Sequence, residues 1–152
     1  MKLIIGNDHG GYKAKMDILE HLKDSGHEIM DIGCDSEDIV RYPNYDAQVA
    51  KAVLSGKADR GILICSTGIG MSIAANKFPG IRASMCTSHY MAKMTRQHND
   101  SNVLCLGGKI TGIFEILEIV DAWLENEYVG GRHDISLGLI RDIEAELHEA
   151  NG

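Results

Sequence analysis

The chain has 152 residues, of which 44% are apolar and 24% are charged, and its formal net charge is -7. This size and composition predict one globular domain, residues 1–152, large enough to bury about two-thirds of the surface of its unfolded chain. The acidic balance argues against a nucleic-acid or anionic-membrane surface, and every apolar run is far shorter than the roughly 20 residues of a membrane-spanning helix.

Short runs rich in Ile and Val alternate with helix-length amphipathic stretches. This alternation is typical of βαβ units and predicts an α/β protein with a parallel sheet of five strands. Strands are expected at 2–7, 28–32, 61–65, 81–86 and 103–106, and helices near 11–25, 43–55, 69–77, 88–97, 111–126 and 134–149. The last helix is expected to pack on its own domain or on a partner subunit. Ligands of such sheets bind beyond the carboxyl ends of the strands, so the polar clusters there are the candidate site.

The first cluster, Asn-Asp-His-Gly-Gly, follows the first strand at 7–11. Asp8 and His9 can contact a hydroxylated or phosphorylated ligand as acceptor and donor. The alternative is a helix cap beside a surface histidine. The loop does not match G-x-G-x-x-G, and the chain has no G-x-x-x-x-G-K-[ST], so dinucleotide and P-loop sites find little support.

The second cluster is a cysteine turn, in which Cys65 ends an apolar strand and residues 66–70, Ser-Thr-Gly-Ile-Gly, lead into a helix. The unpaired N–H groups at the start of a helix can hold an anion and stabilise a thiolate. A thiolate at Cys65 can take a proton from a carbon next to a carbonyl while the amides of the turn stabilise the resulting oxyanion. The alternative is that Cys65 only fills the core.

Four cysteines without C-x-x-C pairing, and an N-terminus without a signal-like pattern, predict a cytoplasmic protein with reduced thiols. They are Cys34, Cys65, Cys86 and Cys105. All except Cys65 are expected to be ordinary core residues.

Two later segments are also candidates. In Arg-Gln-His-Asn-Asp at 96–100, His98 titrates near neutrality and can transfer protons, and Asn99 can bond a sugar oxygen. In Gly-Gly-Arg-His at 130–133, the glycine pair presents Arg132, whose guanidinium suits phosphate. The alternatives are a histidine that complements a helix dipole and a charged surface loop.

Together these motifs resemble the type B ribose-5-phosphate isomerases and the lactose-type galactose-6-phosphate isomerases. The matching segments are DHGG at 8–11, YPNY at 42–45, ILICSTGIGMSIAANKFPGIRA at 62–83, RQHND at 96–100 and GGRH at 130–133. The resemblance implies a doubly wound, Rossmann-like α/β/α sandwich of three layers and a sugar phosphate as substrate. It also implies a homodimer or dimer of dimers with shared active sites, and no metal or organic cofactor.

The resemblance also implies residue roles. Cys65 is then the base that moves the proton between C1 and C2, Thr67 helps at the ring oxygen, and His98 opens the ring from the partner subunit. The implied contacts to sugar and phosphate are Asp8, His9, Ser66, Gly68, Ile69, Gly70, Asn99, Lys109, Arg132 and Ser136.

Some positions depart from the family pattern. Ser136 stands where many relatives have a second phosphate-binding arginine, Lys109 where many have Arg, and Arg41 where many have Asp. Compensation by Arg41, Lys109 or Arg141 is left open by the sequence.

The expected reaction is the interconversion of ribose 5-phosphate and ribulose 5-phosphate through an enediolate. One alternative is isomerisation of a six-carbon sugar phosphate (allose 6-phosphate or galactose 6-phosphate) or of an unphosphorylated rare sugar. An alternative of another class is a catalytically silent sugar-phosphate-binding subunit.

Overall fold

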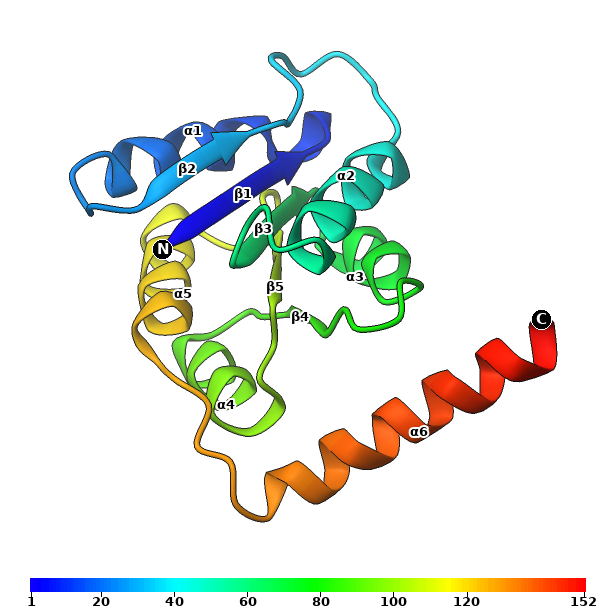
Figure 1. The fold of residues 1–152 in the computed structure, drawn as a ribbon. Coiled ribbons are helices and arrows are strands. Elements are labelled where there is room, and N and C mark those ends of the chain that lie inside the picture. The colour runs from blue at the N-terminus through cyan, green and yellow to red at the C-terminus, as the bar shows by residue number, and fades with distance from the viewer.

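A computed structural model describes residues 1–152 as a five-stranded parallel sheet covered by helices on both faces (Figure 1). The strands are β1 (Lys2–Asn7), β2 (Glu28–Asp31), β3 (Arg60–Cys65), β4 (Ala83–Met85) and β5 (Val103–Gly107). The helices are the short 3-10 helix η1 (His9–Gly11), α1 (Tyr12–Leu22), α2 (Tyr42–Leu54), α3 (Ile69–Ala75), α4 (His89–Asn99), α5 (Ile113–Glu125) and α6 (His133–Asn151).

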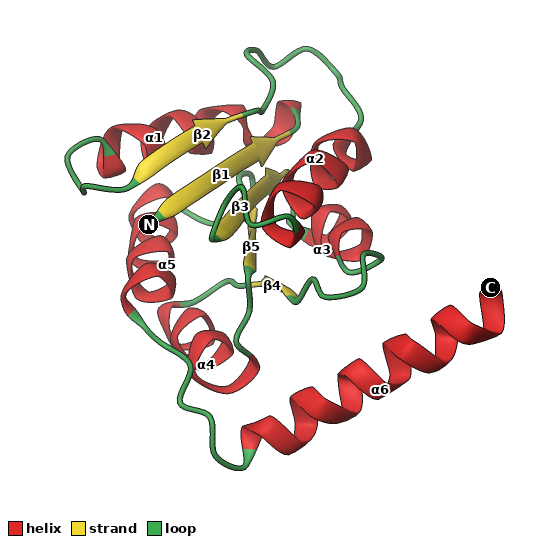
Figure 2. Cartoon of the chain, viewed as in Figure 1, coloured by secondary structure: helices red, strands yellow, loops and turns green.

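Helices α1 to α5 form the outer layers of a three-layer α/β/α sandwich, as expected from the sequence (Figure 2). One core cluster joins the sheet to α1, α4 and α5, and a second joins the opposite face to α2 and α3. Every residue of β3 and β5 is buried, because a parallel sheet covered on both faces hides both sides of its central strands.

The strand order is β2-β1-β3-β5-β4, and it places a reversal of chain direction between β1 and β3. From β1 the chain moves outward to β2, and it then crosses back over β1 to β3. Asn7 at the end of β1 is paired with Ile64 of β3, so the residues after both strands emerge side by side. Such a switch point is where doubly wound sheets bind their ligands.

Strand β4 is shorter than the expected 81–86, and side-chain amides bond to the backbone at its start. The amide of Asn76 accepts a hydrogen bond from Ala83 N–H at 2.8 Å and donates one to Ala83 C=O at 2.9 Å. Asn102 Oδ1 accepts from Arg82 N–H at 2.8 Å. The edge of the sheet is thus closed by side-chain amides, which limits pairing with other chains.

Helix α6 extends away from the sheet along the bottom of the view (Figure 1). Only Leu137 of this helix is buried. The carboxylate of Glu144 accepts a hydrogen bond from Gly80 N–H at 3.0 Å. Five large apolar side chains of α6 are exposed, with exposed fractions of 42–70%: Ile135, Leu139, Ile140, Ile143 and Leu147. Packing of α6 on its own domain is therefore slight.

Candidate active site

The loop after β1 is fixed by its own carboxylate. Asp8 donates its N–H to Ile64 C=O at 3.1 Å, and its Oδ1 accepts from Gly10 N–H at 2.9 Å, which caps η1. His9 Nδ1 accepts from Val40 N–H at 3.3 Å. The neutral imidazole of His9 therefore carries its proton on Nε2, which remains a donor for a ligand.

Two glycines let this loop touch the cysteine turn. A Cβ on Gly10 would lie 2.1 Å from Ser66 Oγ, and a Cβ on Gly11 would lie 2.4 Å from Ile64 C=O. Both distances are far below van der Waals contact, so only glycine allows the two loops to approach this closely.

The cysteine turn holds its thiol against a backbone donor. Cys65 is buried, and its Sγ accepts a hydrogen bond from Gly68 N–H at 3.1 Å. Gly68 has φ 78°, a conformation that favours glycine. Ile69 N–H is directed at Thr67 Oγ1 at 3.3 Å, which holds the threonine hydroxyl beside the turn. The thiol sulfur thus lies in a rigid loop that supplies hydrogen-bond donors.

The loop after β5 supports the turn from the other side. Gly108 N–H donates to Cys65 C=O at 2.8 Å, and Lys109 N–H donates to Ser66 C=O at 3.0 Å. These two bonds bring the exposed Lys109 next to the cysteine turn. The structure thus brings together the sequence-predicted Asp8, His9, Cys65, Ser66, Thr67, Gly68, Ile69, Gly70 and Lys109.

Four other residues that the resemblance assigns to the site lie elsewhere in the chain's own fold. His98 and Asn99 are on the last turn of α4, and Arg132 and Ser136 are at the start of α6. Helix α4 runs from the carboxyl end of β4 to the amino end of β5, so its last turn lies at the amino edge of the sheet. Cys65 lies at the opposite edge.

The strand register gives the size of this separation. Val103, the first residue of β5, pairs with Gly61, and Gly107 pairs with Cys65. Four residue steps of about 3.3 Å place Cys65 roughly 13 Å from the start of β5, and Asn99 precedes that start. The His98 imidazole of a chain is therefore too far from the Cys65 thiol of the same chain for direct proton transfer.

His98 has an aromatic partner at the amino edge. Its ring stacks on the ring of His133, with centroids 4.2 Å apart and planes inclined by 15°. Burial, together with the nearby His98 and Arg132, lowers the pKa of His133. The stacked pair therefore disfavours a positive charge on the His133 ring.

Two residues of α2 join the site although the sequence pattern assigned them no role. The ring of Tyr42 lies 2.9 Å from the position of a Cβ on Gly70, so it covers the start of α3. Asp46 is fully buried, and neither of its carboxylate oxygens has a hydrogen-bond partner. In the sequence, Asp46 can be recognised as an acidic residue on the apolar face of α2, which also contains Val49 and Ala50.

The remaining cysteines differ from Cys65 in their surroundings. Burial raises the pKa of Cys86 to about 12, and burial is also the largest cause that raises the pKa of Cys105 well above its ordinary value. Both are neutral thiols of the core, as expected from the sequence. The structure has no group of three or more His, Cys, Asp or Glu side chains placed to hold a metal ion.

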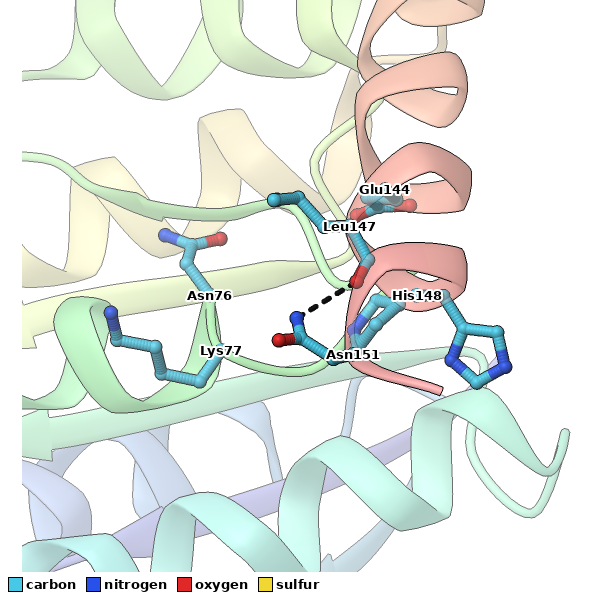
Figure 3. Close-up of a pocket in the computed structure, with 7 residues that line it drawn as sticks. Asn76, Lys77, Glu144, Leu147, His148 and Asn151 are labelled. Carbon is cyan, nitrogen blue, oxygen red and sulfur yellow. Dashed lines mark hydrogen bonds between the residues drawn. The ribbon is translucent and has the colours of Figure 1, made fainter.

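None of the five cavities of the chain is lined by Cys65. The cavity in Figure 3, of about 410 Å³, lies instead between α6 and the end of α3. Its lining is mostly polar and includes Lys77, Glu144 and His148. In a single chain the cysteine turn therefore lies on an open surface, not in an enclosed pocket.

Comparisons with known proteins agree on one group. Residues 3–140 match the family model described as Ribose/Galactose Isomerase. Ribose-5-phosphate isomerase B of Escherichia coli is 49% identical over 94% of this chain and 96% of its own. The structure of ribose-5-phosphate isomerase B from Clostridium thermocellum superposes with a TM-score of 0.95, at 52% identity, over 97% of this chain and 99% of its own. The type B ribose 5-phosphate isomerase of Trypanosoma brucei gives a TM-score of 0.89 at 46% identity, over 93% and 97% of the two chains.

Proposed function

The chain belongs to the ribose/galactose isomerase family, and on this premise we propose how it interconverts ribose 5-phosphate and ribulose 5-phosphate. The observation that supports this proposal is that almost the whole chain aligns, at 49–52% sequence identity, with proteins named for this reaction. The chain is an aldose–ketose isomerase, and neither the six-carbon or unphosphorylated substrates nor the silent subunit is favoured by these relatives.

Cys65 is the base in this proposal. Its thiolate takes the proton from C2 of the open-chain aldose and returns it at C1, while the hydroxyl proton of O2 passes to O1, which gives the ketose. The negative charge that develops on the sugar oxygens in the enediolate needs donors held in place beforehand. Within residues 66–70, Gly68 N–H and Ile69 N–H are bonded to Cys65 Sγ and Thr67 Oγ1, so the donors proposed for this charge are the N–H groups of Ser66, Thr67 and Gly70. Thr67 is also proposed to bind the ring oxygen. Support comes from the Gly68 N–H bond to Sγ, which holds the sulfur at this turn.

His98 is the ring-opening group, and we infer that it comes from a second copy of the chain. The strand register keeps His98 and Cys65 of one chain at opposite edges of the sheet. A twofold dimer can bring the amino edge of one chain to the carboxyl edge of the other, because each surface is then used twice. The open cysteine turn supports the same arrangement, since a second copy would enclose it.

Helix α6 is the proposed means of dimerisation. Its exposed Ile and Leu side chains form a stripe that its own domain leaves uncovered. A matching apolar surface lies on α3, where Ile69 and Ile73 are 50% and 56% exposed. Because α3 follows the cysteine turn directly, a copy that covers these two side chains also lies beside Cys65.

The phosphate is then held by both copies. Lys109 belongs to the chain that supplies Cys65, whereas Arg132 is close in the fold to His98 and arrives with it. Asp8 and His9 bind sugar hydroxyls, and Asn99 of the second copy completes the set. Ser136 contributes a hydroxyl and no charge, so Lys109 and Arg132 supply the positive charge of the clamp.

We also place the protein in the cytoplasm. All four cysteines are free and buried, which suits a reducing compartment. No helix of the chain is long and apolar enough to cross a membrane.

The test is turnover by the purified chain on ribose 5-phosphate, allose 6-phosphate, galactose 6-phosphate and free ribose, compared as kcat/KM. We expect ribose 5-phosphate to be preferred by at least about tenfold, a difference of about 1.4 kcal/mol in transition-state binding. A higher value for a hexose phosphate or a free sugar would refute the assignment of substrate. Absence of turnover on every sugar would refute the assignment as an enzyme.

A further inference from the structure

Asp46 is a buried carboxyl group without a hydrogen bond. Its exposed fraction is 0%, and both Oδ1 and Oδ2 lack a partner. The other buried side-chain atom in this condition is Oδ1 of Asn7, the residue before Asp8. Since buried polar groups almost always find partners, unpartnered oxygens this close to a reaction site call for an explanation.

The packing of α2 places Asp46 under the site. Val49 lies against the sheet, next to Gly6 and Gly61. A Cβ added to Gly6 would lie 3.1 Å from one methyl group of Val49, and a Cβ added to Gly61 would lie 2.4 Å from the other. Asp46 is one helical turn earlier on the same face. Because α2 begins at the carboxyl edge of the sheet, that turn places Asp46 toward the ends of β1 and β3. Tyr42 lies one more turn toward the start of α2, and its ring covers the start of α3.

The groups that face Asp46 are acidic or neutral. Asp8, in the loop after β1, is the charged group that acts on Asp46, and Cys65 of β3 belongs to the same buried cluster as Val49 and Ala50 of α2. Helix α3 has no titratable residue, and α2 contributes only Tyr42 and Tyr45 nearby. Burial, and then the charge of Asp8, raise the pKa of Asp46 to about 8. No cation is among the groups that shift it.

We propose that Asp46 is a positioning residue of the isomerase and that its carboxyl group keeps a proton during turnover. The buried side of the site, below Asp8 and Cys65, then carries no additional negative charge. This inference rests on the proposed function. The reaction already collects the Asp8 carboxylate, the Cys65 thiolate, a phosphate and a developing enediolate. Charges of one sign repel strongly in a poorly solvated site, so an ionised Asp46 opposes both the thiolate and the enediolate.

The experiment compares kcat/KM of wild type and Asp46→Asn from pH 7 to pH 9. Asparagine keeps the size of the side chain and does not titrate. At pH 9 about one-tenth of a group with a pKa of about 8 is still protonated. We therefore expect the ratio of variant to wild-type kcat/KM to rise about tenfold over this range. The ratio removes the titrations that both proteins share. Asp35→Asn, an exposed acid in the loop before α2, is the control, and its ratio is expected to stay flat.

A second readout needs neither turnover nor the variant's folding. The infrared spectrum of the wild-type chain should show the band of a protonated carboxylic acid at pH 7, which disappears with a midpoint near pH 8. A flat ratio for Asp46→Asn, or absence of this band at pH 7, would overturn the inference. If the wild-type chain turns over no sugar, it is the proposed function that fails, and the band still decides whether Asp46 holds a proton.

Discussion

The apolar stripe of α6 gives a quantitative prediction about dimerisation. Ile135, Leu139, Ile143 and Leu147 recur every four residues and are 56–70% exposed. Full burial of such a side chain is worth about 1.5–3 kcal/mol. Because only about three-fifths of each side chain remains to be buried, four of them supply roughly 3–7 kcal/mol per helix. A twofold interface uses two helices and so gains about twice that amount, before the cost of association.

The perturbation is the double variant Leu139→Ser, Ile143→Ser. It removes half of the stripe from each helix, or about 3–7 kcal/mol per dimer, and it should therefore raise the dissociation constant by about 10²–10⁵-fold. The matched control places two serines at charged positions of the same helix, Glu146→Ser and Glu149→Ser. Sedimentation velocity over a range of concentrations measures the mass. We expect monomers and loss of turnover for the first variant only. A dimer that persists at all concentrations would refute the assignment of α6 as the interface.

Three further outcomes are expected. Cys65→Ser should lower kcat by at least about 10³-fold, because a hydroxyl is a far weaker base than a thiolate. The control variant Cys86→Ser should keep its activity. Near-normal turnover of Cys65→Ser in a steady-state assay would exclude the Cys65 thiolate as the base. Gly11→Ala should cost about 1–3 kcal/mol of stability in urea unfolding, since its Cβ would lie 2.4 Å from Ile64 C=O, and an unchanged midpoint would contradict the close contact of the two loops. The carboxyl of Asp46 has a pKa of about 8 in the folded chain and 3.8 unfolded, so the folded state holds the extra proton between these values. Its contribution to stability therefore falls from pH 4 to pH 8 by at most about 1.4 kcal/mol per pH unit, and the advantage of Asp46→Asn in unfolding experiments should grow over that window and then level off.

The fold was largely readable from the sequence because β1, β3 and β5 contain short apolar runs that alternate with helical patterns. Strand β4 is shorter than the sequence predicts, since the bond from Arg82 N–H to Asn102 Oδ1 at its start joins residues 20 positions apart. The end of α4 was placed too early, before His98, although Asp100 with φ 46° ends the helix.

The candidate site was predictable where it is local in sequence, in the loops that contain Asp8 and Cys65. Their contact depends on the strand order, which no local pattern specifies. The role of α2 was missed because Tyr42 and Asp46 reach the site through helix packing. The strand register also separates Cys65 from His98 within one chain, and from this separation we infer the second copy.

The most direct test of the shared site is complementation between two inactive variants, Cys65→Ala and His98→Asn. Each is purified, mixed with the other in equal amounts, unfolded together and refolded, and turnover of ribose 5-phosphate is measured. If Cys65 and His98 act across the dimer, half of the dimers are mixed and each has one intact site, so activity should return to about one-quarter of the wild-type value. If the two residues act within one chain, no chain in the mixture carries both, and activity would stay at the level of the separate variants.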